Sequence, residues 1–174
     1  MLFRTRHQST RRRAIRLIAE ILIFVLIYLG VRAWMQRDMA EGTPPAIQAI
    51  DVSGQNVSLS DFHGQPLLLH FWASWCRICR FEQGAVNAVS DDWPVLTIAM
   101  QSGDARQVRA FMEERQIAWQ TIVDESGNLA NEYGVAGVPA NFILDADGNI
   151  RFHESGYTTS AGLRLRLWLA RLLY

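Results

Sequence analysis

Two cysteines, Cys76 and Cys79, are the only ones in this chain of 174 residues, and they follow directly on an apolar run at residues 67–72. An apolar run of this length is typical of a strand that is buried on both faces of a sheet. If a helix follows, the first sulfur lies at its positive N-terminal end, where a thiolate is favoured. The sequence therefore predicts a strand, a Cys-x-x-Cys turn and a helix in succession, and the dithiol indicates redox catalysis.

Other uses of the cysteine pair fit less well. A structural disulfide between residues three apart would close a very short loop, which constrains the unfolded chain little. A zinc site needs four ligands, and neither a second Cys-x-x-Cys nor a closely spaced histidine pair follows, so we expect no bound metal and no cofactor. The alternative that stays open is a copper-handling protein, because two thiolates suit Cu(I).

The N-terminal end has the pattern of a membrane anchor. Residues 1–16 carry six arginines, and residues 17–35 are apolar apart from Glu20 and Arg32. At about 1.5 Å per residue this stretch can cross a hydrocarbon core of about 30 Å. The positive-inside rule then leaves the N-terminus in the cytoplasm and exports the rest. A cleavable signal peptide is the alternative, although no good Ala-x-Ala site follows.

We expect four segments: a cytoplasmic basic N-terminus at 1–16, a transmembrane anchor at 17–35, a linker at 36–46 that contains two prolines, and a single exported domain at 47–174. From Asp38 onward nine arginines face sixteen acids, a net charge of −7, which argues against a nucleic-acid partner. The chain has no lysine, which excludes Schiff-base chemistry and a Walker-type phosphate site.

The exported part alternates between strand and helix patterns. Asp104 and Gln107 have the spacing of a capping box at the start of one helix. The predicted strands are 47–52, 57–59, 67–72, 95–100, 119–123, 142–145 and 150–153, and the predicted helices are 77–90, 104–115, 126–133 and 160–172. This order describes an α/β sandwich with a mixed sheet flanked by helices.

Two segments resemble the thioredoxin superfamily: residues 71–79, which hold the dithiol, and residues 133–139, which end in Gly-Val-Pro. With the N-terminal anchor, they resemble the membrane-anchored TlpA-like branch. Residues 99–104 and 156–168 are similar, more narrowly, to the D proteins of the suppressor-of-copper-sensitivity system. The resemblance implies a thioredoxin-like fold on the periplasmic side of the bacterial inner membrane.

The same resemblance implies an activity and partners. The protein would be a protein disulfide oxidoreductase that exchanges thiols and disulfides with exported proteins, in the reductive direction. A membrane electron-relay protein would recharge it, in copper tolerance or in cytochrome c maturation. The direction of electron flow is not fixed by the residues themselves, because reduction potentials vary widely among such dithiols.

Individual roles follow from the motifs. Cys76 is the predicted nucleophile, with its sulfur exposed at the helix N-terminus, and Cys79, one turn further along, is the predicted resolving thiol. By resemblance, Val138 and Pro139 form a cis-proline loop whose backbone binds an extended substrate segment. Trp75 would shield the dithiol and offer partners an apolar surface.

Three supporting residues have two interpretations each. Glu82 could buffer protons for the buried thiol, or be an exposed first-turn residue that favours the helix dipole. His70 stands where thioredoxins carry a buried acid, six residues before the first cysteine; it could accept the Cys79 proton or be a core histidine. Arg77 could favour the Cys76 thiolate or be a solvated surface charge.

The last predicted helix carries apolar residues together with arginines. We expect it to pack on the sheet through its apolar side chains, which are Leu163, Leu167, Trp168 and Leu172. The alternative is contact with the membrane, with Arg164 and Arg171 at the interface.

Overall fold

The computed structural model describes residues 6–173 and divides after Arg37 into two compact units. The first unit is the helix α1 (Arg6–Gln36). Within it, Ile15–Trp34 has a mean hydropathy of 2.1 over 20 residues, enough to cross a bilayer, and none of this stretch is buried. Because a signal sequence has the same features, α1 is either a membrane anchor or a signal.

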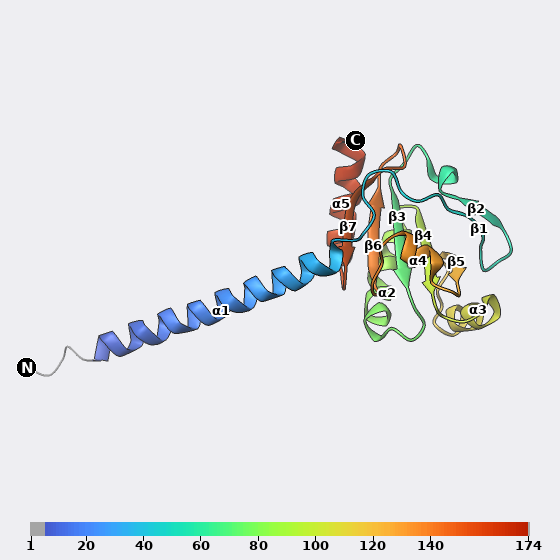
Figure 1. Ribbon diagram of the computed structural model, residues 1–174. Helices are drawn as coiled ribbons and strands as arrows, with labels where there is room; N and C mark the ends of the chain where they lie inside the picture. Colours follow the sequence, from blue (N-terminus) through green and yellow to red (C-terminus); the bar gives the residue numbers. More distant parts are fainter. Residues whose placement is uncertain (1–5, 174) are drawn as a thin grey trace, which may run out of the picture. The chain divides into compact units, whose positions relative to one another are not determined.

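The second unit, Asp38–Tyr174, is built on a five-stranded mixed sheet with the order β5-β4-β3-β6-β7. Figure 1 shows these strands side by side, from β7 on the left to β5 on the right. Strands β3, β4 and β5 are parallel, and β6 and β7 run antiparallel. Their bounds are β3 Leu67–Trp72, β4 Val95–Met100, β5 Gln120–Asp124, β6 Ala140–Leu144 and β7 Ile150–Ser155.

Side chains of β3 alternate between two cores, one on each face of the sheet. Leu68 and Trp72 pack in the core that also holds residues of α2 (Arg77–Ser90), α3 (Ala105–Glu114) and α5 (Ser160–Leu173). Leu69 packs in the opposite core. That core is closed by α4 (Asn128–Glu132), the hairpin β1 (Gln48–Ile50) and β2 (Asn56–Ser58), and the short 3-10 helix η1 (Leu59–Phe62). The predicted thioredoxin-like α/β fold is thereby confirmed.

The segment expected to be a free linker is partly packed on the domain. Met39 is only 5% exposed, and the Ala40 N–H donates to the Tyr133 carbonyl at 3.0 Å. Gly42 pairs with Ile150 at the start of β7. Gly134 allows the segment at Asp38 to lie this close to the domain, because a Cβ at position 134 would be 1.7 Å from the Asp38 carbonyl oxygen. The chain is therefore fixed to the domain from Met39 onward.

The last helix differs in part from its expected packing. Leu163 and Leu167 are buried on the sheet, as predicted. Trp168 and Leu172 are 51% and 58% exposed, so our expectation that they pack on the sheet is wrong. The reason is geometric: a 14-residue helix can turn only one apolar row toward the sheet, and α5 carries two.

Candidate active site

The two cysteines form a disulfide at the start of α2, with their Cα atoms 5.3 Å apart. Cys76 is the N-cap residue, and its sulfur accepts the Cys79 N–H at 3.1 Å. A helix N-terminus stabilises negative charge on a sulfur in this position. In this oxidised form both residues are buried, at 6% and 5% exposure, so Cys76 is less exposed than we expected.

A loop and an apolar surface border the disulfide. The Cys76 sulfur lies 3.4 Å from the carbonyl oxygen of Val138, and the Val138-Pro139 peptide bond is cis. Trp75 is 58% exposed, and its indole N–H donates to the Gln101 carbonyl at 3.0 Å. Val138 thus lies against the Cys76 sulfur, and Trp75 is exposed directly before Cys76. Their role in substrate contact stays a prediction. Arg77 is exposed, directly after Cys76.

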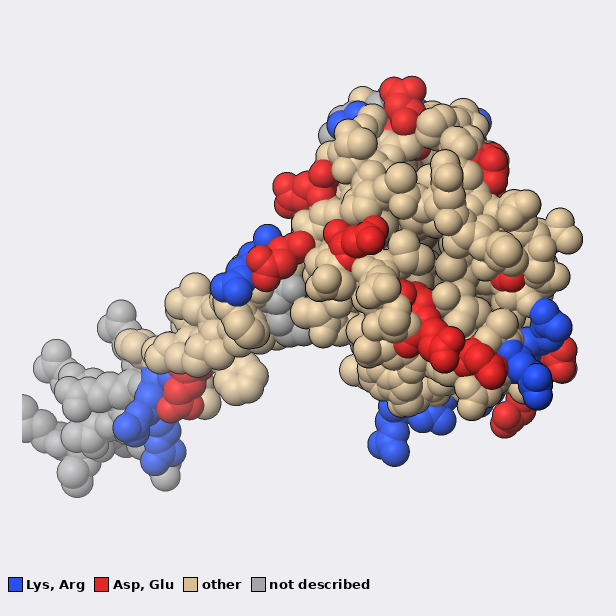
Figure 2. All heavy atoms as spheres, turned by 45° about the vertical axis from the view of Figure 1, so that its right-hand side comes forward, with Lys and Arg blue, Asp and Glu red and all other residues tan. Residues whose placement is uncertain are grey.

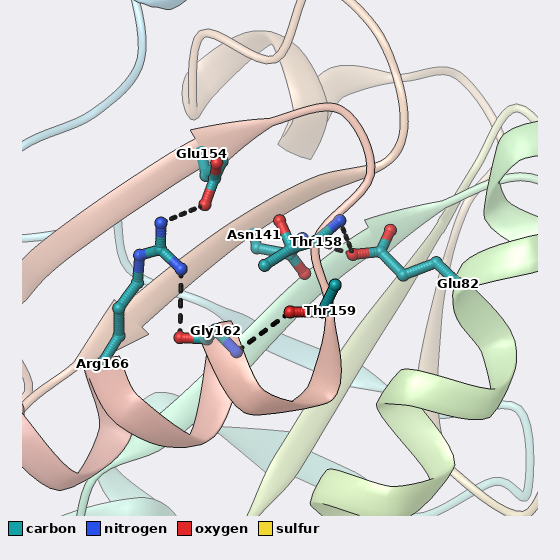
Figure 3. A network of polar contacts seen from close by, with 7 residues as sticks. All are labelled: Glu82, Asn141, Glu154, Thr158, Thr159, Gly162 and Arg166. Atoms are coloured by element: carbon teal, nitrogen blue, oxygen red, sulfur yellow. Dashed lines mark hydrogen bonds and ion pairs between the residues drawn. The ribbon is translucent and has the colours of Figure 1, made fainter.

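Glu82 is buried beneath the first turns of α2 rather than exposed. Its Oε1 atom accepts two hydrogen bonds of 3.0 Å, from the Asn141 side-chain amide and from the Thr158 N–H. Its Oε2 atom has no partner among the described residues. Figure 3 shows the Glu82 side chain reaching from α2 toward Asn141 and Thr158. The interpretation of Glu82 as a solvated residue that favours the helix dipole is therefore wrong.

Burial controls the acidity of Glu82. It raises the pKa of this carboxyl from 4.5 to about 7, against the hydrogen bonds from Asn141 and Thr158, while the charge of Glu154 raises it further. Arg166 of α5 forms an ion pair with Glu154 at 2.6 Å, and Figure 3 shows this pair beside Asn141. A carboxyl that exchanges a proton near neutral pH thus stands one helical turn after Cys79.

His70 is fully buried and also bonds to Asn141, through a contact of 2.8 Å between Nδ1 and the Asn141 side-chain oxygen. Because that oxygen can only accept, the proton lies on Nδ1. Burial lowers the pKa of His70 to about 4, although the bond to Asn141 opposes the shift. His70 is therefore neutral at physiological pH, and Asn141 joins it to Glu82.

These residues belong to a polar row that crosses the whole sheet on the α2 side. Glu154, Asn141, His70, Thr97 and Thr121 are successive cross-strand partners from β7 to β5. At the β5 end, the hydroxyls of Thr97 and Thr121 lie 2.8 Å apart, and the indole N–H of Trp72 donates to Thr97 at 3.1 Å. Each of the five strands contributes one polar side chain to an otherwise apolar layer.

Sequence reasoning missed two residues of this site. Asn141 could have been identified from the sequence, because a polar residue in a strand that is buried along its full length requires a hydrogen-bond partner. Thr158 gave none, because it contributes its backbone N–H, which any residue other than proline could supply.

Comparison with known proteins agrees with this geometry. The sequence matches the AhpC/TSA family over residues 42–153. It is 30% identical over 144 residues to the thiol:disulfide interchange protein DsbE of Pseudomonas fluorescens biotype C, which covers 78% of this chain and 81% of DsbE. It is 27% identical over 160 residues to sporulation thiol-disulfide oxidoreductase A of Bacillus subtilis (strain 168), with 85% and 96% covered.

A solved structure shows the same architecture. The crystal structure of StoA from Bacillus subtilis superposes with a TM-score of 0.59 at 25% identity, over 71% of this chain and 96% of StoA. The family match spans more than half of the chain and includes the cysteine pair. The chain therefore belongs to the AhpC/TSA family, in its thioredoxin-like part, and is a thiol-disulfide oxidoreductase with a Cys-x-x-Cys pair at Cys76 and Cys79.

Proposed function

We propose that α1 anchors the protein in a bacterial inner membrane, with residues 1–16 in the cytoplasm, and that the domain reduces disulfides of exported proteins in the periplasm. The observation that carries the proposal is the position of the Cys76 sulfur, which caps α2 and lies 3.4 Å from the Val138 carbonyl. Six arginines ahead of the apolar span support this topology. We place the anchor at 17–35 and the catalytic domain at 47–174; the connecting segment 36–46 is packed on the domain from Met39 onward.

In the reductive cycle, the Cys76 thiolate attacks one sulfur of a partner disulfide. The partner S–S bond breaks, a mixed disulfide forms, and the departing sulfur takes a proton. Cys79 then loses its proton and attacks the Cys76 sulfur, which closes the Cys76–Cys79 disulfide and releases the second partner thiol. Two electrons pass to the partner, and a membrane electron-relay protein returns them to the domain through a dithiol of its own.

Glu82 serves in this cycle as the proton buffer for Cys79. The two residues are three positions apart on α2 and thus share a helix face. A carboxyl with a pKa of about 7 can take a proton from the resolving thiol at neutral pH and give it up again. His70 is then a positioning residue, because its hydrogen bond is to Asn141, which in turn holds Glu82.

The substrate contacts the protein surface beside the disulfide. The Val138-Pro139 backbone would bind an extended partner segment, and exposed Trp75 would shield the dithiol and offer the partner an apolar surface. Arg77 adds a positive charge next to Cys76 that favours the thiolate. Residues 99–104 and 156–168 support the narrower assignment to the D proteins of the suppressor-of-copper-sensitivity system.

Alkylation of the reduced full-length chain in detergent tests the roles of the two sulfurs. At neutral pH, iodoacetamide should modify Cys76 at least about ten times faster than Cys79, because only Cys76 caps the helix. Mass spectrometry of peptides quenched at successive times measures both rates. Equal rates, or faster modification of Cys79, would contradict the assignment. The same chain should accelerate reduction of a model disulfide, and the Cys76→Ala variant should not.

A further inference from the structure

The outer side of α5 carries an apolar row that the domain leaves uncovered. Leu165, Trp168 and Leu172 are 57%, 51% and 58% exposed, and Leu169, between them, is partly buried. Positions 165, 168, 169 and 172 have the spacing of a single helix face. This row, which we call the outer face of α5, lies apart from Leu163 and Leu167, which pack on the sheet.

Charge on α5 differs from that of the domain that carries it. The chain from Asp38 onward has a net charge of −7, and Figure 2 shows acidic side chains across the domain on the face drawn. By contrast, α5 contains three arginines and no acid. Arg164 binds Asp92 and Arg166 binds Glu154, while Arg171 is exposed. Leucine and tryptophan beside arginine on one helix is the composition of helices that lie at the surface of a bilayer.

The chain enters the domain at the β7 edge of the sheet, where Gly42 pairs with Ile150. The apolar span of α1 ends at Trp34, and Met39 is already buried in the domain core. Five residues span at most about 18 Å when fully extended. At the β7 edge, Glu41 and Gly42 line a surface pocket together with Arg166 of α5. A membrane that holds the span would therefore lie within a short distance of this edge of the domain.

We propose that the outer face of α5 binds the surface of the lipid bilayer in which α1 is anchored. Leu165, Trp168 and Leu172 enter the boundary between headgroups and acyl chains, and Arg171 pairs with anionic headgroups. This inference rests on the anchoring of α1 proposed above. A second copy of the chain could cover the same apolar row, and the experiment must separate the two occupants.

Site-specific fluorescence in vesicles tests the contact. The full-length chain, with both active-site cysteines replaced by serine, carries a single new cysteine labelled with an environment-sensitive fluorophore. The test position is Trp168→Cys on the outer face of α5. Leu26→Cys, 66% exposed within the apolar span, reports the anchor, and Ile50→Cys, 64% exposed on the β1 hairpin, is the matched surface control. The vesicles contain phosphatidylethanolamine and phosphatidylglycerol with brominated acyl chains, which quench a fluorophore at membrane depth.

We expect quenching of at least about twofold at positions 26 and 168 and almost none at position 50. Quenching at 26 without quenching at 168 would overturn the proposal and leave the anchor in place. If position 168 is instead shielded from aqueous iodide without lipid quenching, a second copy covers the face and the proposal is wrong. If position 26 is not quenched, the anchoring of α1 fails, and this contact fails with it. Circular dichroism of each labelled chain confirms its folding.

Discussion

Glu82→Gln should make the oxidised protein more stable at pH 8 and leave its stability almost unchanged near pH 4.5. The folded carboxyl keeps its proton up to about pH 7, whereas in the unfolded chain it loses the proton near 4.5. Between these two values the folded state binds more protons, so stability falls as the pH rises through that window. A pKa difference of this size corresponds to a loss of about 3 kcal/mol, which is complete above pH 7.

Glutamine is a close neutral substitute at this position. Both hydrogen bonds to Glu82 end on Oε1, which a glutamine oxygen can replace, and Oε2 has no partner among the described residues. The glutamine NH2 group would thus occupy the place of a carboxyl O–H that is equally unpartnered. The difference in stability between Glu82→Gln and the wild type therefore reports the ionisation of Glu82 rather than a change in packing.

His70 also makes the stability depend on pH, so the difference in stability between Glu82→Gln and the wild type is more informative than the stability of either chain alone. Its pKa falls from 6.5 to about 4 on folding, so its contribution to stability is lost as the pH drops through that range. Over much of the window the two groups oppose one another in the wild-type chain. Removing the Glu82 carboxyl should therefore expose a slope that rises with pH.

The assay is chemical denaturation of the oxidised full-length chain in detergent, from pH 4.5 to 8.5, followed by tryptophan fluorescence. The stability of Glu82→Gln minus that of the wild type should grow by about 3 kcal/mol across this range. A difference that stays constant with pH would refute the raised pKa of Glu82, and a difference of opposite sign would refute its burial as an acid.

Three other predictions concern the core, the topology and the metal. Asn141→Ala should lower the free energy of unfolding by about 2–4 kcal/mol, because it leaves His70 and Glu82 without their shared hydrogen-bond partner. Asn131→Ala, on the surface, should lower it by less than about 0.5 kcal/mol. Equal losses in the two denaturation curves would contradict the role of Asn141 as the bridge between His70 and Glu82. A reporter fused to the C-terminus should be active only in a form that works outside the cytoplasm, with the whole chain in the membrane fraction; a shortened, soluble product would identify α1 as a cleaved signal. The metal-free chain should catalyse disulfide exchange and bind Cu(I) only weakly; tight binding of one ion that is lost with either cysteine, in the absence of exchange activity, would favour the copper carrier.

The strands and helices around the dithiol could be predicted from the sequence because each has a local signal. The predicted bounds 67–72, 77–90 and 95–100 agree with β3, α2 and β4. The capping box of Asp104 and Gln107 is present at the start of α3. Each of these signals comes from residues that lie near one another in the chain, so tertiary structure had little to change.

Sequence reasoning predicted less where hydrogen-bond partners are distant from one another in the chain. Strand β6 begins at Ala140, two residues before the predicted start, because asparagine is a poor strand former and Asn141 was left outside. Its amide is satisfied by Glu82, 59 residues away, and by His70, 71 residues away. The burial of Glu82 depends on the same partners. The roles of Glu82, His70 and Arg77 in catalysis stay predictions.

Trapping of partner proteins tests the central claim, attack by Cys76 and resolution by Cys79, most directly. The Cys79→Ala chain, expressed at full length in a bacterium, should form covalent adducts with exported proteins that appear on non-reducing gels and vanish with reductant, because attack proceeds and resolution does not. The Cys76→Ala chain is the matched control and should form none. Adducts with Cys76→Ala but not with Cys79→Ala would show that the two roles are reversed, and adducts with neither would contradict disulfide exchange through this pair.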